Sequence, residues 1–213
     1  MIREDFNVGR IVPSTRDLLA GLGMRRRSLA LVPFIESSAG DGGLGDIERL
    51  RDTVRAFASD ASGAVLRGIA LATSDVPVLL TTACRTAEDC QRGRYDGADG
   101  VCIDPTSSAN FPELLRVAHS MRMLPIVLAT GATPFPPSTE REARAFVIDG
   151  SLEQVLFNAA SFPRQAVLIV DWTEYAFSPD ELQRLSGHVD SVLVGPLCYR
   201  ADGFQKLLEA LDA

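Results

Sequence analysis

Lysine is almost absent from this chain of 213 residues. Its basic residues number 21, and all of them except Lys206 are arginine. Arginine stays protonated at every physiological pH, so it cannot serve as a titrating amine. Chemistry that needs a lysine as acid, base or Schiff-base nucleophile therefore has a single candidate. Histidine is scarce as well, with only His119 and His188.

Other features are missing too, and each absence narrows the possible functions. No hydrophobic run approaches the roughly 18–20 residues that a membrane-spanning helix needs, and residues 1–5 lack the basic-then-apolar pattern of a signal peptide. We therefore expect a cytoplasmic protein with no membrane partner. The net charge of −7 argues against nucleic acid as a partner. The cysteines, Cys84, Cys90, Cys102 and Cys198, have neither C-x-x-C spacing nor a compact disulfide framework, so we expect reduced thiols.

Short apolar runs alternate with capped or amphipathic segments along the chain. Such runs are typical of strands that are buried on both faces of a parallel sheet. They predict strands at residues 29–34, 64–66, 76–83, 100–104, 125–129, 154–158, 166–171 and 191–195. Helices are predicted at residues 47–58, 86–95, 111–121, 138–146, from 178 onward and at 202–211.

This alternation predicts an α/β fold, a (β/α)8 TIM barrel formed as a single domain by residues 1–213, with residues 1–28 as a lead-in segment. An open, doubly wound sheet is the alternative. The G-x-G-x-x-G sequence that would favour a dinucleotide-binding sheet does not occur.

Two connections in this predicted barrel, after the second and the sixth strand, are too short for a full helix: residues 68–74 and 159–165. Shortened outer helices would leave apolar strand faces uncovered, and such faces commonly bind a partner. We therefore expect a protein partner or a second copy of the chain at these faces. The residues expected there are Ile69, Leu71, Phe157 and Phe162. Alternatively, residues 6–22 fold back over one of the gaps.

The third predicted strand carries a resemblance to a known family. Residues 76–80 (VPVLL), followed by a helix and by residues 97–101 (GADGV), resemble the "PVL-(R)-K-D-F … GAD-A-V" block of indole-3-glycerol phosphate synthase, a TIM-barrel enzyme of tryptophan biosynthesis. Residues 34–42 resemble its first-strand "EIKRASPSKG" motif, and residues 191–197 resemble its last-strand "avLVGeaL" motif. The resemblance covers roughly residues 29–213 and implies the same barrel.

The resemblance also implies a carbon–carbon lyase chemistry, in which a ring closes by carbon attack on a ketone with loss of carbon dioxide and water. The family uses lysines and a glutamate as general acid and base. Carried over by position, the first-strand glutamate and lysine fall on Pro33 and Ile35, the third-strand lysine on Thr81, and the fifth-strand glutamate on Leu128. None of these side chains can move the required proton, so we expect the catalysis to be lost.

Some family positions are retained. Asn158 matches the first asparagine of the sixth-strand "INNR" motif, while Ala160 replaces its arginine. The seventh-strand "ESGI" motif corresponds to residues 171–173, where Asp171 and Glu174 put negative charge at the phosphate position. Ser38 and Gly195 are matched positions that could still help to hold a ligand.

Candidate site residues lie at the carboxyl ends of the predicted strands, where barrel active sites are built. The weak catalytic candidates are Glu36, Asp104 and Asp171. The ligand-binding candidates are Ser38, Thr81, Asn158, Trp172 and Gly195. The three acids could hold a magnesium ion, but their spacing matches no metal motif, so we expect neither a metal nor a cofactor.

Two further side chains have a structural interpretation as well as a functional one. Cys102 is expected to be a small buried hydrophobe, because neither histidine is predicted at its end of the barrel. Trp172, with Tyr175 and Phe177, could stack on an aromatic ligand, or the three rings could plug the barrel mouth.

Three functions follow from these observations. The first is a catalytically degenerate barrel that acts as a binding, scaffolding or regulatory protein, through a small-molecule ligand or a protein partner. The second is a lyase or isomerase of altered chemistry that uses Glu36, Asp104 and Asp171 on a phosphorylated or carboxylated small molecule. The third is residual indole-3-glycerol phosphate synthase activity.

Overall fold

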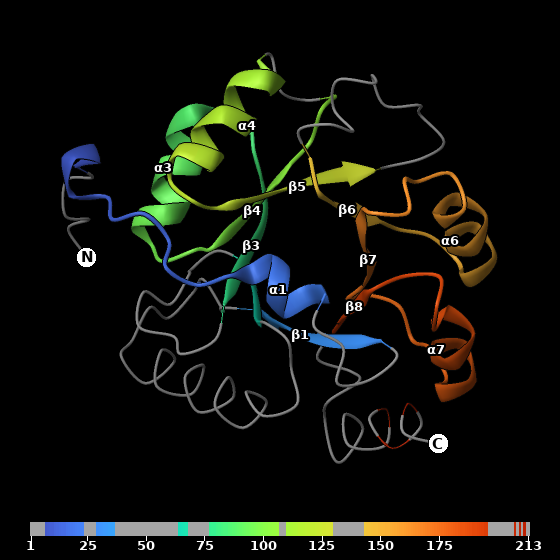
Figure 1. Cartoon of the computed structure of the whole chain (residues 1–213). Helices are drawn as coiled ribbons and strands as arrows, with labels where there is room; N and C mark the ends of the chain where they lie inside the picture. The colour runs from blue at the N-terminus through green and yellow to red at the C-terminus, as the bar shows by residue number, and fades with distance from the viewer. Residues whose placement is uncertain are drawn as a thin grey trace.

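The computed structural model describes residues 7–23, 29–36, 64–67, 77–106, 110–129 and 143–195, together with 207, 209 and 211. At residues 21, 23, 33–36, 64–67, 78 and 80–82 only the backbone is described. Eight parallel strands follow one another in chain order, and β1 also pairs with β8, so that the ring of strands closes (Figure 1). The α/β class and the all-parallel sheet predicted from the sequence are confirmed.

The strands are β1 (Ala30–Glu36), β2 (Ala64–Arg67), β3 (Val78–Cys84), β4 (Gly100–Ile103), β5 (Leu124–Ala129), β6 (Ala145–Ile148), β7 (Val167–Trp172) and β8 (Ser191–Val194). The helices are the short 3-10 helix η1 (Val8–Arg10), α1 (Leu18–Gly23), α3 (Ala87–Tyr95), α4 (Phe111–Ser120), α6 (Leu152–Ala159) and α7 (Pro179–Leu185). Figure 1 shows α3 and α4 together on one side of the strands, and α6 and α7 on another. No helix in the described ranges has the length and apolar content that crossing a bilayer requires.

Two helix starts follow directly from the sequence. Thr86 caps α3 and Ser178 caps α7, each through a capping box with the acid three residues later, Asp89 and Glu181. Each box satisfies backbone N–H groups that would otherwise have no partner in the first turn. The predicted helix at 47–58 lies outside the described residues. Within the predicted helix at 202–211, the described residues 207, 209 and 211 are helical.

Between residues 138 and 158 the sequence-based assignment is wrong. The predicted helix at 138–146 runs into β6, whose four residues are all buried. The predicted strand at 154–158 is part of α6. Ser151 caps that helix in a capping box with Gln154, a polar signal that decides for a helix. The spacing of the buried Leu152, Val155 and Ala159 is helical, and Phe157 is 76% exposed.

This correction removes the shortened connection expected after the sixth strand, because α6 follows β6 at ordinary length. Phe157 is therefore an exposed residue of a helix and not part of an uncovered strand face. Phe162 is partly buried, and its ring centroid lies 5.1 Å from that of Phe146. The connection from β2 to β3 spans residues 68–77, of which 68–76, including Ile69 and Leu71, lie outside the described residues.

Side chains alternate along each strand between the barrel interior and the layer under the helices. The interior cluster takes its members from β1, β3, β4, β5, β6, β7 and β8: Val32, Leu79, Cys102, Leu124, Ile126, Ala145, Val147, Ile169 and Leu193. The alternate positions of the same strands pack outward, for example Val170 and Val194. The barrel core and the outer layer are therefore separate clusters.

The N-terminal segment closes the barrel at the amino ends of the strands. Leu18 and Leu22 of α1 belong to the interior cluster and are 2% and 0% exposed. Gly100, the first residue of β4, makes room for them, because a Cβ there would collide with the Leu18 side chain. Residues 6–22 are expected, as one alternative, to fold over a gap beside a shortened helix; Leu18 and Leu22 instead fill the amino end of the barrel.

A buried ion network holds this segment in place. The Asp99 side chain, fully buried, accepts hydrogen bonds from the Ser14 hydroxyl at 2.6 Å, the Arg16 Nε at 2.7 Å and the Arg94 guanidinium at 3.0 Å. Arg16 also donates to the Gly97 carbonyl at 2.8 Å. Two positive charges and a hydroxyl compensate the desolvation of one carboxylate, which is the condition for burying it.

Candidate functional site

Asp171 faces the barrel interior at the carboxyl end of β7. Val167 and Ile169 on the same strand pack with the interior cluster, whereas Leu168, Val170 and Trp172 pack outward, so alternation turns Asp171 inward. Electrostatics agree with this placement. Burial raises the pKa of the Cys102 thiol on β4 to about 12, and the nearby Asp171 charge adds to the effect.

Asp104 occupies the matching place after β4. Cys102 belongs to the interior cluster, so position 104 follows the inward-facing side of that strand. Its Oδ1 accepts hydrogen bonds from the Thr106 amide at 2.8 Å and the Thr106 hydroxyl at 2.7 Å. Asp171 repeats the pattern, with its Oδ1 accepting from the Thr173 amide at 3.1 Å and hydroxyl at 2.7 Å.

Both strand ends thus carry the same three-residue Asp-x-Thr turn, at residues 104–106 and 171–173. A turn of this type fixes the orientation of the carboxylate through bonds to the backbone amide and the hydroxyl two residues on. In both turns the Oδ1 atom is the acceptor. Among the described residues Asp171 has no other hydrogen-bond partner, which leaves its Oδ2 available as an acceptor. The repeat of Asp-x-Thr at two predicted strand ends is the signal in the sequence that indicates this shared turn.

Trp172 does not line the barrel interior. Its side chain is 1% exposed and belongs to the outer cluster with Leu182 of α7. The indole Nε1 donates to the Gly150 carbonyl at 3.0 Å, and the ring centroid lies 5.5 Å from that of Tyr175 and 5.0 Å from that of Phe177. Alternation sends Trp172 outward because its neighbour Asp171 faces inward. Neither ligand stacking nor a plug in the barrel mouth agrees with this position.

Asn158 is likewise not at a strand end. It is a half-buried residue of α6, and its carbonyl accepts from the Ser161 amide at 2.9 Å. The ligand-binding prediction for Asn158 depended on a strand at 154–158, which the helix replaces. The match to the family's sixth-strand asparagine therefore does not place this side chain at the barrel mouth.

Gly195 follows β8 directly and is buried. A Cβ at this position would collide with the carbonyl oxygen of Thr173. The backbone after β8 therefore packs closely against the Asp-x-Thr turn after β7. Glycine at 195 is required for this approach, whatever it contributes to a ligand.

For the remaining site candidates, Glu36, Thr81 and Ser38, the structure describes the backbone alone or nothing. Glu36 ends β1 and is in register with Arg67 of β2, and Thr81 lies within β3. Their side chains lie outside the described part of the structure, as does all of Ser38. Among the described residues, no three His, Cys, Asp or Glu side chains come together in a way that could hold a metal ion.

Leu128 occupies the position at which the resemblance places a glutamate. It lies near the carboxyl end of β5 and packs against the interior cluster. An apolar side chain therefore stands where the family's proton-transfer group would be. The sequence matches no protein-family model and no curated protein.

Proposed function

We propose that this protein is a cytoplasmic (β/α)8 barrel related to indole-3-glycerol phosphate synthase that has lost the ring-closing chemistry and binds a small molecule at the carboxyl ends of its strands. The proposal depends above all on one observation: Asp104 and Asp171 are held by the same Asp-x-Thr hydrogen bonds at the ends of β4 and β7, while the described interior side chains Cys102 and Leu128 offer no group for proton transfer.

The loss of chemistry is supported by Leu128 and Cys102. Leu128 has no titratable group, and a thiol with a pKa of about 12 stays protonated at neutral pH and cannot act as a base. Losing the acid and base of such a reaction typically costs about 10²–10⁴ in rate for each group. A carbon–carbon lyase of this type would therefore turn over too slowly to serve the cell.

The binding role is supported by the two oriented carboxylates. Carboxylates accept hydrogen bonds, so a ligand that presents hydroxyl, amide or ammonium donors suits Asp104 and Asp171. A phosphate dianion does not suit them, because like charges repel in a partly desolvated site. We therefore place a polyhydroxy or amino compound here, and not the phosphoester that the family's enzymes use.

Docking of a protein at the strand faces has less support. α6 packs with β6 in one outer cluster, so the uncovered face expected beside the sixth strand is occupied. Small-molecule binding is the function that the remaining geometry favours.

Two measurements test the proposal. Purified protein incubated with the carboxyphenylamino-deoxyribulose phosphate substrate is expected to form indole-glycerol phosphate at less than about 10⁻⁴ of the rate of an intact enzyme, since both acid and base are missing. Complementation of a tryptophan auxotroph that lacks this step is expected to fail. Robust turnover or complementation would contradict the loss of catalysis.

The binding part has its own measurement. Amide NMR titration with a pentitol is expected to shift the Thr106 and Thr173 resonances, because those amides donate to the two carboxylates. Asp171→Asn should weaken the response, whereas Asp180→Asn on the exposed first turn of α7 is the matched control and should not. Amides that stay unmoved in the wild type would refute this binding role.

A second candidate is a lyase or isomerase of altered chemistry, favoured by the available Oδ2 of the inward-facing Asp171. An oriented carboxylate at a barrel mouth is the form that a general base takes. If an activity is found, Asp171→Asn is expected to abolish it while leaving the unfolding midpoint unchanged. Full activity in that variant would remove this candidate.

A further inference from the structure

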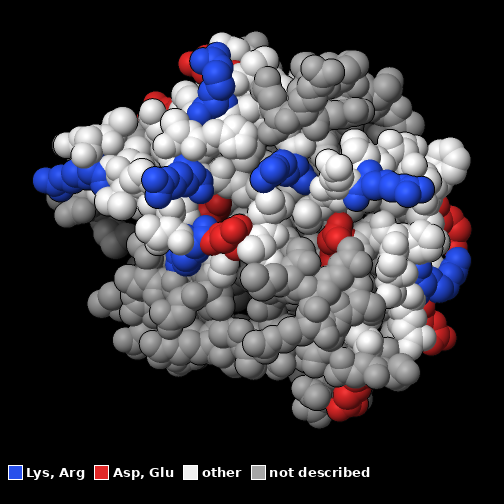
Figure 2. All heavy atoms as spheres, viewed as in Figure 1, with Lys and Arg blue, Asp and Glu red and all other residues white. Residues whose placement is uncertain are grey.

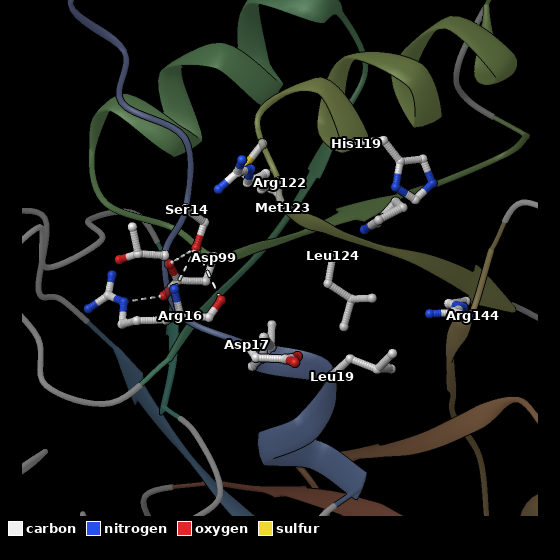
Figure 3. A pocket seen from close by; sticks show the side chains of 13 residues that line it. Ser14, Arg16, Asp17, Leu19, Asp99, His119, Arg122, Met123, Leu124 and Arg144 are labelled. Atoms are coloured by element: carbon white, nitrogen blue, oxygen red, sulfur yellow. Dashed lines mark hydrogen bonds and ion pairs between the residues drawn. The ribbon is translucent and has the colours of Figure 1, made fainter.

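A pocket lies at the amino ends of the strands, opposite to the Asp-x-Thr turns. Its volume is about 420 Å³, and it is bounded by the N-terminal segment, the end of α4 and the starts of β5 and β6 (Figure 3). Cavities of a few hundred Å³ are the usual size of small-molecule sites. Leu19, Met123, Leu124 and Pro125 give the pocket an apolar surface.

Arginine dominates the charge of this pocket. Arg122 and Arg144 are exposed residues on its lining, and neither has an ion-pair partner in the described ranges. His119, also exposed, lies on the same lining. Figure 2 shows Lys and Arg side chains in a band across this face of the molecule. Positive charge therefore gathers on this face of a chain whose net charge is −7.

The two acidic residues of the lining have partners of their own. Asp99 is neutralised by Arg16 and Arg94 in the buried network. Asp17 accepts a hydrogen bond from the Ala20 amide at 2.9 Å and so satisfies the start of α1. With three arginines (Arg16, Arg122 and Arg144) against two aspartates (Asp17 and Asp99), the lining keeps a net charge of +1 when His119 is counted as neutral.

Arg122 also stands in a backbone conformation that does not favour arginine. Its φ is 55°, in the left-handed region, where glycine is the usual residue. The amides of Arg122 and Met123 donate to the carbonyls of His119 at 2.9 Å and Ala118 at 3.0 Å, which closes α4 in a Schellman motif. A positive charge at a helix C-terminus offsets part of the conformational cost. Strain retained at a pocket is an observation from which function can be inferred.

We propose that this pocket is a binding site for a small organic anion, a carboxylate or phosphomonoester carried on an apolar body, with Arg122 holding the oxyanion and Arg144 adding positive charge from another side of the pocket. A planar guanidinium can donate two parallel hydrogen bonds to either oxyanion. The apolar lining receives the rest of the molecule. The site is independent of the proposed function, because it lies at the other end of the barrel and uses none of the same residues.

Calorimetric titration of the full chain with phenyl phosphate, benzoate and the neutral benzyl alcohol tests the proposal. We expect at least one anion to bind and benzyl alcohol not to bind, and the comparison of the two anions distinguishes phosphate from carboxylate. Arg122→Gln is expected to lower the affinity about tenfold or more, since it removes a charged hydrogen bond, and Arg144→Gln is expected to lower it by a smaller factor through the lost positive charge. Arg164→Gln, an exposed arginine outside the pocket, is the matched control and should leave it unchanged.

Arg122→Gly separates binding from stability. Glycine relieves the left-handed strain at this position, so the variant should unfold at the same or a higher temperature while still losing affinity. Three outcomes would overturn the site: no anion binding up to about 10 mM, equal binding of benzyl alcohol, or an equal loss of affinity in Arg164→Gln.

Discussion

Replacing Asp99 by asparagine removes the carboxylate charge that Arg16 and Arg94 share. The Asp99 side chain is fully buried, and the arginine side chains are 19% and 13% exposed. Asparagine keeps the shape and one acceptor oxygen, so a bond from Ser14 or from one arginine can persist. The other guanidinium is left in a mostly buried position without its counter-charge. The change therefore tests the electrostatics of the network with little change in packing volume.

The magnitude follows from that burial. Removing one partner of a buried ion pair typically costs about 3–5 kcal/mol. Both arginines retain some contact with water and asparagine retains an acceptor, so we place Asp99→Asn at the low end, about 3 kcal/mol. Since domains are stable by about 5–15 kcal/mol, this is a large fraction of the whole.

The matched control is Glu88→Gln on α3. Glu88 and Arg92 form an ion pair at 3.7 Å with side chains 67% and 43% exposed. Surface pairs of this kind contribute about 0–1 kcal/mol. Urea unfolding of both variants should therefore give a clear difference in midpoint at similar slope.

Hydrogen exchange supplies a second readout for Asp99→Asn. Because the network anchors the N-terminal segment, amides of α1 should lose protection more than those of α7, which contributes none of the network's described partners. If Asp99→Asn and Glu88→Gln cost the same, or if α1 keeps its full protection, the network does not hold the segment as argued.

Two further predictions concern the carboxyl end of the barrel and the barrel core. Gly195→Ala should lower the free energy of unfolding by about 3 kcal/mol, because the new Cβ overpacks against the Thr173 carbonyl. Gly187→Ala is the control and should lower it by about 1 kcal/mol, since Gly187 has a positive φ but no neighbour within 4 Å. Equal losses in urea unfolding would argue against the close approach of Gly195 to Thr173. The pKa of the Cys102 thiol rises from 9.0, its ordinary value, to about 12 in the folded protein. Protein stability is therefore unaffected by ionisation of this group below pH 9, and it declines by about 1.4 kcal/mol per pH unit between pH 9 and pH 12, where the unfolded chain ionises first. Cys102→Ala should reduce this loss of stability at alkaline pH. An unchanged dependence of the unfolding free energy on pH in that variant would contradict the role of Cys102.

The strands were predictable where an apolar run has only one interpretation. Residues 166–171 and 191–195, rich in valine, isoleucine and leucine, fall on β7 and β8. A run buried on both faces needs no periodicity to be recognised. The same reasoning failed at 154–158, because a short apolar run is compatible with either a strand or a buried helix face. Ser151 and Gln154, two polar residues outside the run, decide for the helix.

The position of Trp172 could not be deduced from its place at a strand end alone. Whether a strand-end side chain faces the mouth or the helices depends on strand parity, and one residue of register exchanges the two. The partners of Asp99 could not be predicted from the sequence for a different reason. Ser14 and Arg16 are more than 80 residues away in sequence, and no local pattern links them. The Gly97-Ala98-Asp99 motif indicated the barrel, but it did not indicate that its aspartate anchors the N-terminal segment.

Charged residues that precede strands and charged residues that follow them lie at opposite ends of the barrel. Arg144 directly precedes β6 and Asp149 directly follows it, Arg122 lies before β5, and Asp104 follows β4. Because every strand runs the same way, residues that precede strands gather at one end and residues that follow them at the other. Asp99, which precedes β4, and Asp190, which precedes β8, are exceptions: two arginines neutralise Asp99, and Asp190 accepts a hydrogen bond from the Leu168 amide at 2.9 Å. On this polarity the two proposed sites differ in the ligand that suits them: an anion at the amino end and a hydrogen-bond donor at the carboxyl end.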